Sequence, residues 1–220
     1  MCGWKLAEKT YINKKTVKEK YVLDPSETLP HTTCLTPYYG ARSNAAAPIA
    51  NPDAATTLFT DTMKENIQTD NEVYASTNAN ATISGRFAEV AHKFVFDVSK
   101  FLVLPTIITK IDYGWDGYCT TTAGKVLRLT TGGWKSVTTS LPTSDGSGME
   151  FSETLTSIIG AVVNNKFTFG INSYLQYTET PVSITLYTDY VYVTITYIIS
   201  DLLNAPIIKP KVIGVSGYER

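Results

Sequence analysis

The chain has 220 residues, of which 43% are hydrophobic, 11% aromatic and 18% charged. This balance is typical of a folded protein and excludes an intrinsically disordered one. The net charge of −1 gives no reason to expect nucleic-acid binding through a basic surface.

Residues 1–62 are predicted to form an N-terminal arm and linker. Within residues 1–36 six lysines alternate with apolar side chains, which fits either a hairpin with lysines on its exposed edge or an arm that docks on an acidic neighbour. Residues 37–62 contain three prolines and a low-complexity run at Ser43 to Pro48, without hydrophobic periodicity. This pattern is typical of a linker or a long extended segment.

Residues 63–200 are predicted to form one β-sandwich domain, most simply a jelly roll, because short alternating runs are separated by turn signals. A polar stretch at residues 78–84 is interpreted as a loop. Strands are expected at residues 92–98, 107–118, 124–130, 134–139, 166–172 and 184–198. Residues 153–163 carry apolar side chains at helical spacing, so one short helix is expected there.

The strongest strand signal is the run from Tyr190 to Ile198, where β-branched and aromatic residues alternate with a period of two. Val191, Val193, Ile195 and Tyr197 are predicted to face the core. The opposite face is a ladder of tyrosine and threonine, which fits either solvent or a subunit interface. Tyr190 and Tyr192 are the interface candidates on this face.

Two other strands give a prediction for the core. Phe94, Phe96 and Val98 alternate inward. In the strand at residues 107–118, one face is expected to carry Ile107, Thr109, Ile111, Tyr113 and Trp115.

Residues 201–220 are predicted to form an extended tail. Pro206 and Pro210 exclude a central strand or a helix, and Ile207 and Ile208 between them need an apolar surface to cover. The tail either packs on its own domain or crosses to a neighbouring copy, which makes both isoleucines interface candidates.

Several aromatic residues are candidates for a sugar-binding platform, because the face of a pyranose presents C–H groups to an aromatic ring. Trp134 follows a Gly-Gly turn and is the better candidate for an exposed ring, although a tryptophan at the start of a strand can also pack under its own hairpin. Trp115 shares a face with core residues and is predicted to be buried. The proposed ligand-binding set is Trp134, Tyr118, Tyr174 and Tyr177.

Catalytic and metal-binding patterns are weak. Cys2, Cys34 and Cys119 form no CxxC motif, so one disulfide or three reduced thiols remain open. His31 with Cys34 lacks an orienting partner, and His92 is interpreted as a hydrogen-bonded residue that opens an edge strand. Asp112, Asp116 and Asp145 are either turn-forming residues or ligands of one structural Ca²⁺. No enzymatic activity, other metal or cofactor is expected.

Three segments together resemble a known type of module: Phe94-Val-Phe with Ile107 to Gly117, the hairpin from Val126 to Val137 around Trp134, and the closing strand from Thr188 to Tyr197. They resemble the jelly-roll modules of prokaryotic surface proteins and of structural proteins of tailed viruses, which are related in shape to carbohydrate-binding domains. The resemblance implies a fold and no set of catalytic residues.

Two functions follow as expectations. The first is a non-enzymatic structural protein of a virus particle, either a tail, fibre, decoration or minor capsid component, that associates with itself and with other virion proteins. The second is a carbohydrate-binding module of a surface or secreted protein, with host-surface glycans as partners. No secretion signal and no membrane-spanning run is recognised, so assembly in the host cytoplasm is expected for the first function and an extracellular location for the second.

Overall fold

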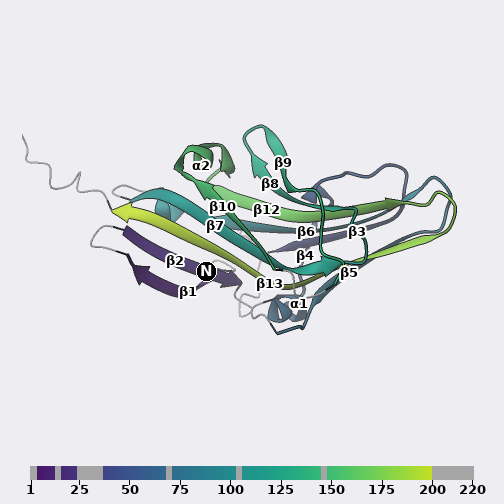
Figure 1. Ribbon diagram of the computed structural model, residues 1–220, viewed down its shortest axis with the longest axis horizontal. Helices are drawn as coiled ribbons and strands as arrows, with labels where there is room; N and C mark the ends of the chain where they lie inside the picture. The colour runs from purple at the N-terminus through teal and green to yellow at the C-terminus, as the bar shows by residue number, and fades with distance from the viewer. Residues whose placement is uncertain are drawn as a thin grey trace, which may run out of the picture.

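The structure is a computed structural model that describes residues 4–12, 16–23, 37–67, 71–102, 106–144 and 148–199. Within these residues two antiparallel β-sheets pack face to face, as Figure 1 shows. The predicted all-β sandwich with a short helix is confirmed. The tail at residues 201–220, with Ile207 and Ile208, lies outside the described residues, as do Cys2, His31, Cys34 and Asp145.

The first sheet has six strands in the described part of the chain, in the order β1-β2-β13-β7-β10, with β5 also paired to β13. Strand β13 is the longest and has β7 along one side. Its other side pairs with β5 at residues 182–188 and with β2 at residues 192–198. The strands are β1 (Trp4–Tyr11), β2 (Thr16–Leu23), β5 (Ala75–Ala81), β7 (Thr106–Cys119), β10 (Met149–Thr154) and β13 (Val182–Ile199).

The second sheet has seven described strands in the order β4-β3-β6-β12-β8-β9, with β11 paired to β12. They are β3 (Tyr38–Ala45), β4 (Thr57–Leu58), β6 (Phe87–Asp97), β8 (Gly124–Thr130), β9 (Gly133–Thr138), β11 (Val162–Val163) and β12 (Lys166–Gln176). The described helices are η1 (Pro52–Ala54), α1 (Asp61–Asn66), η2 (Ser99–Phe101) and α2 (Leu155–Ala161). The helix predicted at residues 153–163 therefore corresponds to α2.

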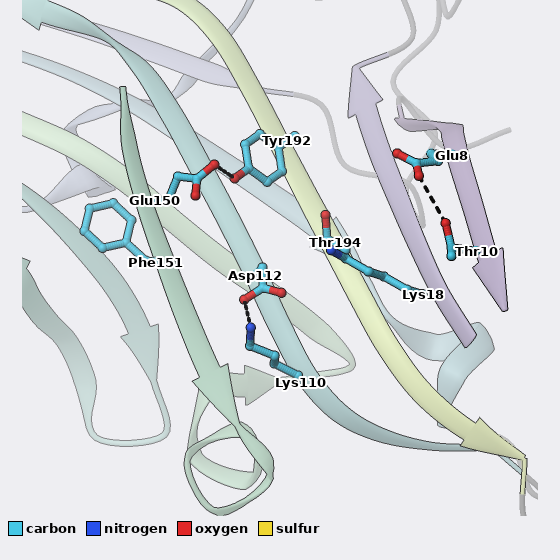
Figure 2. A pocket seen from close by; sticks show the side chains of 9 residues that line it. All are labelled: Glu8, Thr10, Lys18, Lys110, Asp112, Glu150, Phe151, Tyr192 and Thr194. Carbon is cyan, nitrogen blue, oxygen red and sulfur yellow. Dashed lines mark hydrogen bonds and ion pairs between the residues drawn. The ribbon is translucent and has the colours of Figure 1, made fainter. Parts of the chain in front are cut away.

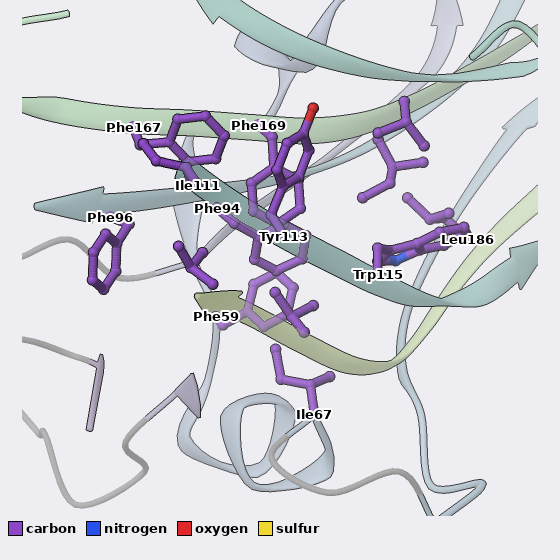
Figure 3. Close-up of a cluster of buried hydrophobic side chains, with 14 of the residues drawn as sticks. Phe59, Ile67, Phe94, Phe96, Ile111, Tyr113, Trp115, Phe167, Phe169 and Leu186 are labelled. Carbon is purple, nitrogen blue, oxygen red and sulfur yellow. The ribbon is translucent and has the colours of Figure 1, made fainter. Parts of the chain in front are cut away.

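The core lies between the two sheets and is rich in aromatic rings (Figure 3). Tyr113 of β7 lies 4.9 Å from both Phe167 and Phe169 of β12, measured between ring centroids. Trp115 is 1% exposed, so its predicted core position is confirmed. The inward faces predicted for Phe94, Phe96 and Val98 and for Val191, Val193, Ile195 and Tyr197 are also confirmed, because all of these side chains are buried.

The core-facing residues predicted for β7 are wrong at the start of the strand. The register against β13 skips a residue between the pairs Thr196↔Lys110 and Tyr197↔Ile108, which makes Thr109 the extra residue of a β-bulge. Because a bulge exchanges the two faces of a strand, Ile108 is buried and Ile107 is 37% exposed.

Of the two alternatives predicted for residues 37–62, the linker is wrong, whereas the long extended segment agrees with the strand and the packed stretch found there. Residues 38–45 form β3, which pairs with β6, and residues 52–54 form η1, which packs on the outer face of the second sheet. Gly40 and Gly170 make this packing close: a Cβ on Gly40 would lie 1.9 Å from the carbonyl oxygen of Ala54, and one on Gly170 would lie 2.7 Å from Cβ of Pro52. The glycines therefore explain how a proline-containing segment lies flat on a sheet.

The predicted loop at residues 78–84 begins as a strand. Residues 75–81 form β5, whose buried side chains are mostly alanines that alternate with exposed polar ones. The hairpin predicted within residues 1–36 is confirmed by the antiparallel pairing of β1 with β2, and β2 joins it to the edge of β13.

Candidate functional site

The outer face of the six-stranded sheet carries polar side chains and several tyrosines. Val191, Val193, Ile195 and Tyr197 of β13 are buried, so the residues that alternate with them face outward. The outward residues of β13 are Tyr187, Tyr190, Tyr192, Thr194 and Thr196. The tyrosine and threonine ladder predicted from the sequence therefore faces away from the core, although Thr194 is itself buried by its neighbours.

A β-bulge in β13 decides which tyrosines face outward. Thr188 pairs with Gly117 and Tyr190 with the preceding residue Asp116, so Asp189 is an extra residue. The Asp189 side chain is buried and accepts hydrogen bonds from the backbone N–H groups of Asn71 and Glu72. The extra residue puts Tyr187 and Tyr190, three positions apart, on the same face.

Tyr192 lies across the neighbouring strand β7. A Cβ on Gly114 would lie 2.2 Å from Cε1 and 2.7 Å from Cζ of the Tyr192 ring, so the ring covers the glycine directly. Its hydroxyl donates a hydrogen bond of 2.5 Å to Oε1 of Glu150 in β10. Burial and this carboxylate raise the pKa of Tyr192 well above its usual value, so the hydroxyl keeps its proton and acts as the donor.

A groove of about 550 Å³ runs across this face, from the β1–β2 hairpin to β10 (Figure 2). All five adjoining strands contribute to it, and most of the side chains are polar. Its lining residues are Glu8 and Thr10 of β1, Lys18 of β2, Tyr192 and Thr194 of β13, Lys110 and Asp112 of β7, and Glu150 and Phe151 of β10.

The carboxylates in the groove have partners within the protein. Nζ of Lys110 lies 2.7 Å from Oδ1 of Asp112, and Oγ1 of Thr10 donates a hydrogen bond of 3.1 Å to Glu8. Glu150 accepts the hydroxyl of Tyr192. The groove thus presents hydrogen-bond donors and acceptors around the ring of Tyr192.

A second depression of about 290 Å³ adjoins the groove and shares Glu150 and Tyr192 with it. Asp116, Gly148 and Tyr190 contribute to its lining. The ring of Tyr190 lies 5.8 Å from that of Tyr192, so the two tyrosines predicted as interface residues are neighbours on this surface. Further along β13, Tyr187 stacks on Tyr118 at 4.4 Å, and Tyr74 contacts both rings edge-on.

The predicted ligand-binding set does not form one platform, because its members lie on different sheets. Tyr118 is on the outer face of the six-stranded sheet. Tyr174 lies in β12 of the other sheet, where its ring contacts Phe87, and Trp134 begins the edge strand β9 beside Leu129. Tyr177 follows β12 and packs against the core.

The prediction for His92 is confirmed in part, because the residue is hydrogen-bonded but does not lie in an edge strand. It lies in the middle of β6 with an exposure of 0%, and its two ring nitrogens lie 2.8 Å from the hydroxyls of Thr77 and Thr188. Burial lowers its pKa to about 3. The ring is therefore neutral and structural, and it contributes nothing to the groove.

The two described aspartates that were candidates for a calcium site, Asp112 and Asp116, line different depressions. Asp112 is paired with Lys110 in the groove, and Asp116 faces the second depression. Among the residues that the structure describes, no group of three or more His, Cys, Asp or Glu side chains is placed to hold a metal ion.

Sequence reasoning missed Gly114 and Glu150, the two residues that fix Tyr192. A signal was present for the glycine, because a glycine between Tyr113 and Trp115 within a strand indicates close approach by another group. No signal identified Glu150, since its role depends on β10 lying beside β7, a pairing between residues 34 or more positions apart.

The fold and this surface define an all-β sandwich that presents a polar groove with a fixed tyrosine ring on one sheet. A family model described as "Uncharacterized protein, C-terminal domain" (AF_1625_C) matches residues 32–197, and the chain belongs to this family. No curated protein matches the chain.

The chain is also weakly similar to a solved structure. It is described as "Structural basis for the promiscuous specificity of the carbohydrate-binding modules from the beta-sandwich super family" and is 13% identical to the chain. The match covers 82% of this chain and 74% of that one, with a TM-score of 0.21, which is too low to carry an argument about function. In the part of the chain that the structure describes, no helix is long and apolar enough to span a membrane.

Proposed function

We propose that this protein is a non-enzymatic module that binds glycans in the groove on the outer face of its six-stranded sheet. The observation that carries the proposal is the geometry of Tyr192, whose ring lies over Gly114 and whose hydroxyl is fixed by Glu150. A ring fixed in this way keeps its position without a ligand, so little conformational entropy is lost on binding. The open face of such a ring suits the C–H groups of a sugar.

The polar lining supports the same proposal. Sugar hydroxyls both donate and accept hydrogen bonds, and the groove offers acceptors at Glu8, Asp112 and Glu150 and donors at Lys18 and Lys110. The volume of about 550 Å³ lies in the range of ordinary ligand sites. Because each carboxylate already has a protein partner, the proposed role is binding without catalysis.

The test is binding to an array of neutral and acidic glycans by the wild-type chain and by Glu150→Ala and Tyr192→Ala. Wild-type binding that falls at least tenfold in both variants supports the proposal. Tyr174→Ala, which changes a tyrosine on the other sheet, is the matched control and is expected to bind as the wild type does. Binding that survives in Tyr192→Ala would place the site elsewhere, and a wild-type chain that binds no glycan would reject the function.

A second candidate is assembly of a particle, including a virion, through the same face. Tyr190 and Tyr192 are neighbours there, and tyrosine is enriched in protein interfaces. Light scattering coupled to size-exclusion chromatography separates the two functions. A defined oligomer that dissociates in Tyr190→Ser would favour assembly, whereas a monomer at high concentration would count against it.

A further inference from the structure

The β1–β2 hairpin forms one side of the groove but lies outside the residues that the family model matches. It spans residues 4–23, and the match begins at residue 32. Among its described side chains, Glu8, Thr10 and Lys18 line the groove. The shared sandwich supplies the rest of the lining, including the Tyr192 ring.

We infer that this hairpin is a specificity wall, which makes the groove select an extended, uncharged glycan chain rather than a single sugar. The inference rests on the proposed function and adds the class of ligand and the element that selects it. Three features of the described residues carry it: the anchoring of the hairpin, the width of the groove and the balance of its charges.

The hairpin is anchored by side chains as well as by backbone pairing. Glu19 of β2 is 5% exposed, and its carboxylate lies 2.9 Å from Nζ of Lys9 and accepts a hydrogen bond of 3.0 Å from the hydroxyl of Tyr197. Tyr197 is part of the core and contacts Phe101. The wall is therefore attached to the core of the sandwich, and its groove side is held in place.

The width of the groove favours a chain. Neighbouring strands in a sheet are about 4.8 Å apart, so the four intervals from β1 to β10 span roughly 19 Å. Lining residues come from both ends of that distance, namely Glu8 and Glu150. A single sugar at Tyr192 reaches only the middle of the groove, whereas a chain across the strands also reaches Glu8 and Lys18 on the wall.

The charges favour a neutral ligand. Among the side chains that the structure describes, the groove contains three carboxylates (Glu8, Asp112 and Glu150) and two ammonium groups (Lys18 and Lys110), and the adjoining depression adds Asp116. Lys110 is already paired with Asp112. A chain of uronic acids would therefore meet more negative than positive charge, whereas hydroxyls use either kind of group as a partner.

The experiment measures, by isothermal titration, binding of linear glucan, xylan and mannan oligosaccharides of two to six sugars, with oligogalacturonates as the anionic probe. The variant Glu8→Ala/Lys18→Ala removes the two charged side chains of the wall. Lys135→Ala/Glu179→Ala, which removes one exposed lysine and one exposed glutamate outside the groove, is its control.

We expect the affinity of the wild-type chain for a neutral oligosaccharide to rise at least tenfold from two to six sugars. The wall variant is expected to lose this gain and to bind the disaccharide within twofold of the wild type, while the control keeps both affinities. Affinity that is independent of length, an unaffected wall variant, or tighter binding of oligogalacturonate would overturn the inference. If Tyr192→Ala still abolishes binding in that case, the proposed function stands; if no probe binds, both fall.

Discussion

His92 of β6 and Thr188 of β13 join the two sheets through a hydrogen bond of 2.8 Å between Nδ1 and Oγ1. The same threonine oxygen accepts the indole N–H of Trp115 at 2.8 Å, and the other ring nitrogen of His92 meets Thr77. A polar network thus crosses the core between the two sheets, and every ring nitrogen in it has a partner. Such a network is costly to disturb, because its groups are cut off from water.

This network predicts that acid destabilises the protein through His92. Its pKa is lowered to about 3 in the folded state, whereas an unfolded histidine titrates near 6.5. The unfolded state therefore takes up a proton first, and the stabilisation, fully present above pH 6.5, is lost as the pH falls toward 3. We expect the free energy of unfolding in urea to decrease by up to about 1.4 kcal/mol per pH unit between pH 6 and pH 5.

The control for this prediction is the other histidine of the chain, His31. His92→Gln is expected to be less stable at pH 7 but to lose the dependence on pH between 6 and 5, while His31→Gln keeps it. An unchanged slope in His92→Gln would contradict the assignment.

The second prediction concerns Gly114. Gly114→Ala places a Cβ where the Tyr192 ring now lies, so the ring must swing away and lose its bond to Glu150. We expect glycan binding to fall about as far as in Tyr192→Ala, with a loss of stability of about 1 kcal/mol for the broken hydrogen bond. Gly160→Ala, in α2 with open space around the added methyl group, should bind normally; equal losses in both variants would refute the explanation.

The third prediction concerns Glu89, which is 0% exposed in β6. Its carboxylate lies 2.7 Å from Nη1 of Arg42 and accepts hydrogen bonds from the backbone N–H groups of Ile49 and Ala50 and from the amide of Asn172. Glu89→Ala leaves these donors unsatisfied, and we expect it to lower the free energy of unfolding by about 2–4 kcal/mol. Glu179→Ala, at an exposed turn, should change it by less than about 0.5 kcal/mol.

The fourth prediction concerns Cys119, a free and fully buried cysteine of β7. Burial raises the pKa of its thiol, which lowers the fraction of reactive thiolate. We expect iodoacetamide at pH 7.5 to leave Cys119 unmodified in the native protein and to modify it fully in urea, as measured by peptide mass spectrometry. Rapid modification without denaturant would show that the β7–β13 region opens readily.

The sequence predicted those strands that can be recognised from the alternation of their own residues. Alternating β-branched and aromatic residues identified β6, β7, β12 and β13, because burial on one face requires that alternation. It failed for β3 and β5, which consist largely of Gly, Ala, Ser and Asn. These residues have low strand propensity, and their strands depend on pairing with β6 and β13.

The candidate site was predicted only in part, for a similar reason. Tyr190 and Tyr192 were recognised because alternation shows which side chains face outward. Their partners were not, since Glu150 and the hairpin reach Tyr192 only through the order of strands in the sheet. Trp134 and Tyr174 were grouped with Tyr118 by residue type, although pairing of β9 with β8 and of β12 with β6 puts them on the other sheet.

The pairing of β2 with residues 192–198 of β13 has a consequence for solubility. That stretch, Tyr-Val-Thr-Ile-Thr-Tyr-Ile, has no charge, proline or glycine, and such segments aggregate when their backbone edge is open. The hairpin covers the edge and presents β1 in its place, whose exposed Glu8 and Lys9 discourage pairing with another molecule. We therefore expect a chain truncated before residue 24 to expose the edge of β13 at residues 192–198 and to form fibres through it.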